Sequence, residues 1–525
     1  MDSNQEATIP LTFWVNEGEE EEKYVVIEAS GDFVDVLFSF LTLPLGTIMR
    51  LVSKKNKPLE IGCINNLYHS VEKFSTDDVF WNHMCKQMLL SPRNPLEASC
   101  KRLKVKVDDT EPTKYLMCGR CSKGGDLLLS TFDGARCYCG NLMRIEMKLA
   151  EESKKEASGD NGSFVKRDAM FLIFNDLRVL QSSPGNTIQQ LRQLGYKDIN
   201  KITKKTLNVG KDEIFSTLEQ ALTSKSLLCD ALLTKRGPKP MMYSPDTDPS
   251  QHMSFIKLKI TMRKSENKIL FVEAEGDFVD FLFSFLSIPL GSILNLMNGK
   301  SSLGNIDNLY TSVKNLNPSW FIGSSKNSLL NPGVANKFGC VSQPMLVPEE
   351  DTPRYWYGSV VGKANIRRNM ISKNKDMVED PVALKLFDPR SSDGARESPV
   401  GFTKRPFLFV VSDDLQVKPM TTTSSILYVQ ELNVPLDDFE EHLVEIKNSR
   451  EALNLFWASL TSKVALTHSL FHLVKKRECE MCILGCIRWK KDRYGNKGRD
   501  GKKKEKEEEK IEKCNSKEKE EEKLE

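Results

Sequence analysis

The 525-residue sequence has no long apolar segment and no leader-like N-terminus. Its first residues, MDSNQEATIPLTFW, contain neither a basic stretch nor an apolar stretch after it, so we expect no secretory signal peptide. No segment reaches the roughly 18 to 20 consecutive apolar residues that a membrane-spanning helix needs. We therefore expect a protein that is not secreted, has no transmembrane segment and resides in the cytoplasm, the nucleus or both.

The common catalytic motifs are missing as well. The sequence has no G-x-x-x-x-G-K-[ST], no G-x-G-x-x-G, no H-E-x-x-H and no G-x-S-x-G, and its six histidines are scattered. We therefore assign no catalytic and no cofactor-binding residue. Because catalytic groups can assemble from distant parts of a chain, an enzyme of unrecognised class stays an open alternative.

The sequence also lacks a strong excess of charge in its main part. The net charge is +3, and the residues from Lys475 onward contribute 18 basic and 14 acidic side chains, which leaves about −1 for the first 474 residues. A main part of this charge is not expected to bind polyanions in general.

A long duplication is the clearest feature that is present. The apolar segment GDFVDVLFSFLTLPLG, Gly31–Gly46, recurs as GDFVDFLFSFLSIPLG, Gly276–Gly291, and 15 of 21 positions are identical between Gly31–Leu51 and Gly276–Leu296. Further matches continue at an offset that falls only from 245 to 238. A period this long indicates duplication of a whole domain. We predict a first domain over 1–234, a linker over 235–253, a second domain over 254–474 and a disordered charged tail over 475–525.

Each copy predicts the same mixture of elements. In the first copy, residues 11–15 and 23–29 are typical of a hairpin, 169–180 of a strand, and the segment beginning at 215 of an amphipathic helix. Without a regular alternation of strand and helix, the pattern favours two tandem α+β domains. Polar segments at 151–163, 372–381 and 388–399 are expected to be loops.

The duplicated apolar segment itself predicts a buried core helix. Asp32, Asp35, Ser39 and Thr42 form one narrow polar stripe at helical spacing, and the rest of the surface is apolar. We assign Asp32 to the N-cap and Asp35 to the third helical position. About twelve residues span only about 18 Å at 1.5 Å per residue, too short to cross a bilayer.

These motifs carry a family resemblance. FVDFLFSFLSIPLGSI, the later IDNLY.SV, DDLQV and the closing LTSK resemble the plant proteins of domain-of-unknown-function family 674, over nearly the whole chain to about Phe471. The resemblance implies a plant origin and a family without an assigned activity, so it transfers no catalytic residue.

The sharpest chemical signal is a group of four cysteines within residues 115–145 of the first copy. Cys118 and Cys121 form a C-x-x-C, and Cys137 and Cys139 a C-x-C followed by glycine. Four thiolates complete a tetrahedral zinc site, so we predict a zinc-ribbon-like cysteine knuckle with structural Zn²⁺. The alternative is four reduced cysteines without a metal. In the second copy Gly358 and Val361 occupy the positions of the first two cysteines, which is consistent with loss of the whole site.

The C-terminal tail permits several interpretations. The basic run Arg488–Lys504 holds nine basic and two acidic residues and precedes a mixed Lys/Glu run. Such a segment is usually solvated without a specific partner, but it also suits nuclear import or nucleic-acid contact. Cys479, Cys482 and Cys486 with the following basic run admit a peripheral, acylated membrane anchor, or a second metal site.

Together these features favour a non-enzymatic binding or scaffold protein with protein partners and one structural zinc site. The alternatives are a nucleic-acid-associated zinc protein that uses the ribbon and the basic tail, and the unrecognised enzyme.

Overall fold

We describe the fold from a computed structural model. It describes residues 7–16, 23–54, 60–121, 127–150, 162–196, 198–223, 255–341, 344–361, 367–391, 398–420 and 422–475. The predicted linker and the tail beyond Lys475, including Cys479, Cys482 and Cys486, lie outside these ranges. Below, the first half denotes the described residues up to 223, and the second half those from 255 onward.

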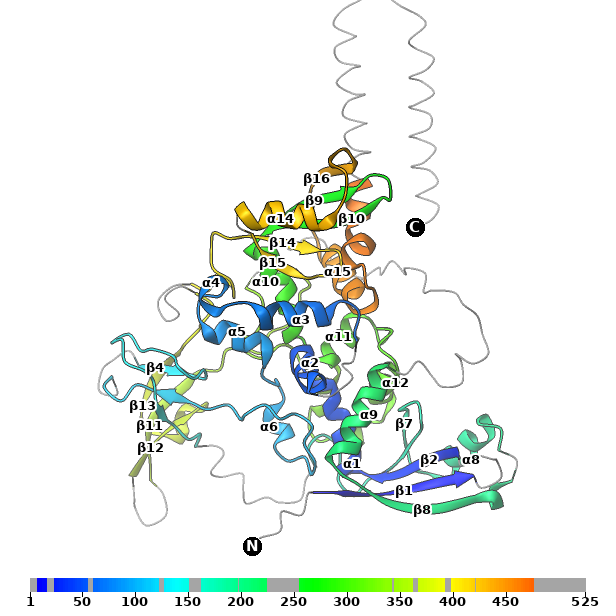
Figure 1. Cartoon of the computed structure of the whole chain (residues 1–525). Coiled ribbons are helices and arrows are strands. Elements are labelled where there is room, and N and C mark those ends of the chain that lie inside the picture. The colour runs from blue at the N-terminus through cyan, green and yellow to red at the C-terminus, as the bar shows by residue number, and fades with distance from the viewer. Residues whose placement is uncertain are drawn as a thin grey trace, which may run out of the picture.

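The structure is α+β, as predicted, and it contains two five-stranded sheets with corresponding strand orders, β7-β6-β2-β1-β8 and β15-β14-β10-β9-β16. Figure 1 shows these sheets at opposite ends of the molecule. The strands of the first are β1 (Ile9–Asn16), β2 (Lys23–Ser30), β6 (Met170–Ile173), β7 (Val179–Gln181) and β8 (Ile202–Val209). The strands of the second are β9 (Ile256–Arg263), β10 (Lys268–Glu275), β14 (Leu408–Ser412), β15 (Val417–Pro419) and β16 (Phe439–Ile446). The predicted hairpin is the antiparallel β1–β2 pair.

The helices also recur in both halves. Those of the first half are α1 (Gly31–Ser39), α2 (Leu45–Ser53), α3 (Ile64–Lys73), α4 (Thr76–Val79), α5 (His83–Leu90), α6 (Glu97–Cys100), α8 (Pro184–Gln193) and α9 (Lys211–Thr223). Those of the second are α10 (Gly276–Ser284), α11 (Leu290–Leu296), α12 (Ile306–Asn315), α13 (Ser325–Leu330), α14 (Thr422–Leu432) and α15 (Ser449–Thr461), followed by helical residues 465–475. Short 3-10 turns η1 (Phe40–Thr42) and η3 (Phe285–Ser287) extend α1 and α10. Among the described residues, no helix has the length and apolar character needed to cross a membrane.

The duplicated segment is a core helix in both halves, but the predicted capping roles are wrong. The N-cap of α1 is Ser30, and Asp32 instead binds Arg167 at 3.0 Å. The Asp35 carboxylate is buried and accepts backbone N–H groups from Ser163, at 2.5 Å, and from the two residues that follow it. Burial raises the pKa of Asp35 to about 6, although the three N–H donors oppose that rise. This aspartate therefore fixes a distant loop.

The two halves cross at the end of these helices. The Leu45 N–H donates to the Ile288 carbonyl at 3.1 Å, and the corresponding Leu290 N–H donates to the Leu43 carbonyl at 3.0 Å. Beyond the crossing, α3 packs on β15 and α10 of the second half, while α12 packs on β7 and α1 of the first. A helix of each half thus packs against the sheet of the other half.

Reciprocal hydrogen bonds repeat this exchange. The Asn66 side chain donates to the Asp414 carbonyl at 2.9 Å, and Asn308 donates to the Asp176 carbonyl at 2.9 Å. Likewise the Cys63 N–H donates to Ser459, and the Asn305 N–H to Ala221. A single cluster of buried apolar residues extends through both halves. The division at 235–253 stays a prediction, and the halves so divided share one core.

Cutting the chain between the halves is expected to leave them associated. A protease site inserted at residues 235–253 of the full chain would be cleaved and the product passed through size exclusion in native buffer. Because each half completes the other's core, both fragments should elute together and separate only in denaturant. Gly46→Val is the matched disruption, since a Cβ there would lie 2.5 Å from the Leu89 carbonyl and 3.1 Å from that of Leu286. Fragments that part in native buffer, each still folded, would contradict the shared core.

A third sheet is built from both halves, in the order β12-β11-β13-β4-β3-β5. Its strands are β3 (Leu116–Met117), β4 (Leu127–Ser130), β5 (Ile145–Glu146), β11 (Tyr355–Val361), β12 (Arg367–Ser372) and β13 (Glu379–Leu386). The halves join where β4 runs parallel to β13, and Figure 1 shows β4 beside β11, β12 and β13. A bridge between Leu149, after β5, and Ile371 on β12 closes the sheet into a ring, which we call the shared barrel.

The expected loop at 372–381 is wrong over its last part. Residues 379–381 begin β13, which pairs with β11 and β4, and the preceding turn is fixed because the Ser372 hydroxyl donates to the Asn374 carbonyl at 2.5 Å. The polar sequence is suited to this strand because many of its side chains are exposed. Polarity alone therefore did not distinguish an exposed strand from a loop.

Candidate metal centre

Two short turns at one end of the shared barrel carry the four cysteines. Cys118 directly follows β3, whose two residues pair with both β4 and β5. The second turn is tight, because the Cys137 N–H donates to the Asn141 carbonyl at 2.9 Å and the Gly140 N–H donates to the Cys137 carbonyl at 2.8 Å. Gly140 has φ +80°, a conformation that favours glycine.

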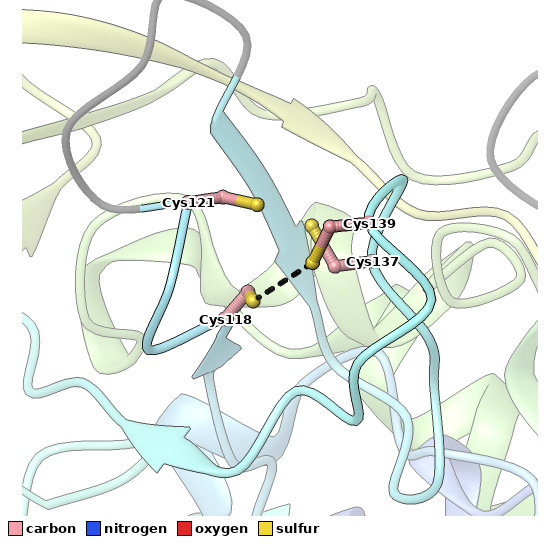
Figure 2. Close-up of side chains that lie close together, drawn as sticks. All are labelled: Cys118, Cys121, Cys137 and Cys139. Atoms are coloured by element: carbon pink, nitrogen blue, oxygen red, sulfur yellow. Dashed lines mark hydrogen bonds between the residues drawn. The ribbon is translucent and has the colours of Figure 1, made fainter.

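The structure brings all four sulfurs together. The Sγ atoms of Cys118, Cys121, Cys137 and Cys139 lie within 4.8 Å of one another, and Figure 2 shows them converging on one point. Cys118 Sγ and Cys139 Sγ are 3.6 Å apart, well beyond the roughly 2.05 Å of a disulfide bond. Four sulfurs about 2.3 Å from a tetrahedral Zn²⁺ would be about 3.8 Å apart. The donor set and its spacing therefore fit zinc.

The electrostatics of the cluster favour a bound cation. Hydrogen bonding to Cys139 raises the pKa of the Cys121 thiol to about 12, and burial raises the pKa of Cys137. The Asn141 side chain donates to Cys139 Sγ at 3.1 Å and lowers the pKa of that thiol to about 6. Thiolates this close repel one another, and a divalent cation removes that penalty.

Exposed arginines surround the cysteine turns. Arg120 and Arg136 each directly precede a cysteine in the sequence, and Arg144 follows Cys139 by five residues. The Arg136 guanidinium donates to the Gly140 carbonyl at 2.9 Å. A Zn²⁺ held by four thiolates carries a net charge of −2, which these cations balance in part. Asn141 and these arginines were not predicted from the sequence, although each lies within five residues of a cysteine.

The second half fills the equivalent place with a hairpin. There β11 runs on through Gly358 to Val361 and pairs with β12 along its length, where the first half turns away at Cys118. A side chain at Gly358 would not fit, because a Cβ would lie 2.3 Å from the Glu379 carbonyl. The second half thus has a continuous strand ladder where the first half has the two cysteine turns.

A small cavity lies elsewhere, beside the predicted polar stripe. It has a volume of about 70 Å³, and its lining includes Ser39, Asn94, Glu97, Cys100 and Lys101. Burial raises the pKa of the Cys100 thiol to about 12, so this cysteine is protonated at neutral pH. Ligand sites are usually several hundred Å³, and this one is far smaller.

Fold and cysteine cluster together define the class, an α+β protein with a clustered four-cysteine site. The family model for "Protein of unknown function (DUF674)" matches residues 5–449, and the chain belongs to that family. The resemblance read from the repeated motifs is thereby confirmed. Comparison with curated proteins and with solved structures gives no match.

Proposed function

We propose that Cys118, Cys121, Cys137 and Cys139 bind one structural Zn²⁺, and that the chain works as a non-enzymatic intracellular binding or scaffold protein. The convergence of four sulfurs within 4.8 Å carries the metal proposal. Catalytic zinc usually has three protein ligands and an open position, whereas four cysteines leave none. The eight cysteines in the described part of the chain are not joined in disulfides, as suits a reducing compartment.

The zinc would stabilise the part of the shared barrel that comes from the first half, where the strands are short. β3 and β5 have two residues each and β4 has four, while β11 and β13 of the second half have seven and eight. Strands this short contribute few hydrogen bonds, and zinc binding by small ribbons is coupled to their folding. In this proposal the zinc holds the first half's share of the barrel in place.

The scaffold role rests on the two halves. Corresponding sheets end in strands of different charge, Lys204 and Lys205 on β8 against Glu440 and Glu441 on β16, so each half offers a related but distinct surface. A protein of this kind recognises partners by surface complementarity and needs no reactive group.

Metal content tests the site directly. The purified full chain is expected to contain one zinc per molecule by elemental analysis, and Cys118→Ser combined with Cys137→Ser to contain almost none, because two thiolate ligands are lost. Cys63→Ser is the matched control, since this buried cysteine donates to the Ser462 carbonyl at 2.9 Å, outside the cluster. Zinc-free wild type, or equal zinc in the double variant, would refute the site.

The nucleic-acid alternative gains one observation, the exposed Arg120 and Arg144 beside the cysteines. It requires RNA or DNA binding that weakens steeply with salt and is reduced by Arg120→Glu with Arg144→Glu. Binding that is absent at low salt would remove this alternative while leaving the zinc site intact.

A further inference from the structure

The two end sheets finish in edge strands of equal length. β8 and β16 each have eight residues, and in the described part of the chain β8 forms a ladder only with β1 and β16 only with β9. Figure 1 places β8 and β16 at opposite ends of the molecule. An edge strand is a template for another strand unless it is protected by charge, curvature or cover.

These two edges carry opposite charge. From residue 199 to the end of β8 there are three lysines, Lys201, Lys204 and Lys205, and no acidic side chain. β16 holds Glu440, Glu441 and Glu445 and no lysine or arginine, and Asp437 and Asp438 precede it. Two β8 edges therefore repel each other, as do two β16 edges, whereas β8 and β16 attract.

Two of the acidic side chains at the β16 edge already form ion pairs within the molecule. Glu441 pairs with Lys259 at 2.8 Å, and Asp438 pairs with Arg263 at 2.9 Å. Glu440 and Glu445 have weaker neighbours, since Glu440 is 3.5 Å from the His442 ring and Glu445 is 3.8 Å from Lys447. These two glutamates are the acidic groups most available to a second molecule.

Each edge also exposes an apolar side chain. Leu207 on β8 is 49% exposed, and Leu443 on β16 is 60% exposed. On one face of each strand, Leu443 lies between Glu441 and Glu445, and Leu207 lies next to Lys205. The charges repel an edge of the same sign, while the leucine offers apolar area to an edge of opposite sign.

We propose that β8 of one molecule adds to β16 of a second copy of this chain, so that copies associate head to tail. The contact is heterologous, because the two surfaces differ. Since the edges lie at opposite ends of the molecule, each contact leaves one edge of each kind available. The product is a concentration-dependent series of oligomers, which closes into a ring or continues as a filament according to the rotation between neighbours.

Charge reversal on the full-length, metal-loaded chain tests the pairing by sedimentation velocity at low salt. Variant A carries Lys201→Glu and Lys204→Glu, and variant B carries Glu440→Lys and Glu445→Lys. Each is expected to associate at least about tenfold more weakly than wild type, because attraction becomes repulsion. Mixing A with B should restore association, since A then has two acidic edges and B two basic ones. A chain carrying all four changes should also associate again.

The restoration separates this pairing from other causes. Lys104→Glu with Lys106→Glu reverses two exposed lysines away from both edges and should leave association unchanged. Monomeric wild type at all concentrations, or A and B that associate like wild type, would overturn the proposal. The proposal would also be overturned if neither the A–B mixture nor the chain with all four changes regained association. Loss in B but not in A would assign β16 to another basic occupant, such as the C-terminal segment, and would also overturn it.

Discussion

Stripping the metal is expected to expose the amides of β13, a strand that belongs to the other half of the chain and contains no cysteine. β13 pairs in parallel with β4, with Leu384 beside Leu127 and Leu386 beside Leu129, and the Phe387 N–H donates to the Leu129 carbonyl at 2.8 Å. β4 in turn pairs with β3, which leads directly into Cys118. Loss of the proposed zinc is therefore expected to weaken the hydrogen bonds of the second half that continue from β3 through β4 to β13.

Hydrogen–deuterium exchange measures the effect. After zinc removal by a chelator under reducing conditions, protection at 384–387 is expected to fall by roughly 100-fold, equivalent to about 3 kcal/mol, because zinc binding by such small segments supplies much of their folding free energy. Protection in β10 and β14, which pair Val272 with Val411 in the second sheet, should stay unchanged. Restored zinc should restore the protection.

A different pattern would contradict the coupling. If exchange increased at β3 and β4 but not at β13, the knuckle would be an independent appendage and the shared barrel would be stable without it. If the Cys118→Ser, Cys137→Ser variant kept full protection at 384–387, the cysteines would have no part in holding the barrel.

Local signals allowed the sequence to predict the individual elements. The apolar period over Gly31–Gly46 predicts a buried helix because nearly every side chain there is apolar, and the helix is buried. The paired cysteines predict a cluster because thiols at such spacings meet only when the chain turns back on itself, and the four sulfurs converge. Each of these inferences needed only residues close in sequence.

The arrangement between the halves has no such local signal. The crossing at Leu45 and Leu290, and the parallel pairing of β4 with β13, join residues that are about 250 positions apart. Hydrophobic periodicity says which face of an element is buried but does not say against which partner. β8 and β16 occupy the same place in the two sheets. Because their side chains carry opposite charges, the two strands could not be recognised as equivalent from their sequences.

The aspartates of the repeated GDFVD motif show how one pattern can have two causes. Acidic residues in a first helical turn usually interact with the helix N-terminus. Here Asp280, like Asp35, accepts from a loop that contacts the opposite half: its carboxylate accepts from the Thr403 N–H at 3.0 Å and from Arg405 at 2.7 Å. Thr403 also forms a bridge with Phe80 of the first half. The buried carboxylate therefore helps to join the halves.

Asp280→Ala is expected to lower the free energy of unfolding by about 3–5 kcal/mol, because it leaves the half-buried Arg405 without its inner partner. Asp277→Ala is the matched control: that carboxylate binds the same guanidinium at 2.8 Å, but its side chain is 61% exposed against 2% for Asp280, so about 1 kcal/mol or less is expected. Denaturant unfolding is compared at pH 7.5, where the Asp280 carboxyl is ionised, since burial raises the pKa of Asp280 only to about 6. Equal losses in the two variants would show that burial of the carboxylate is not what makes this contact strong.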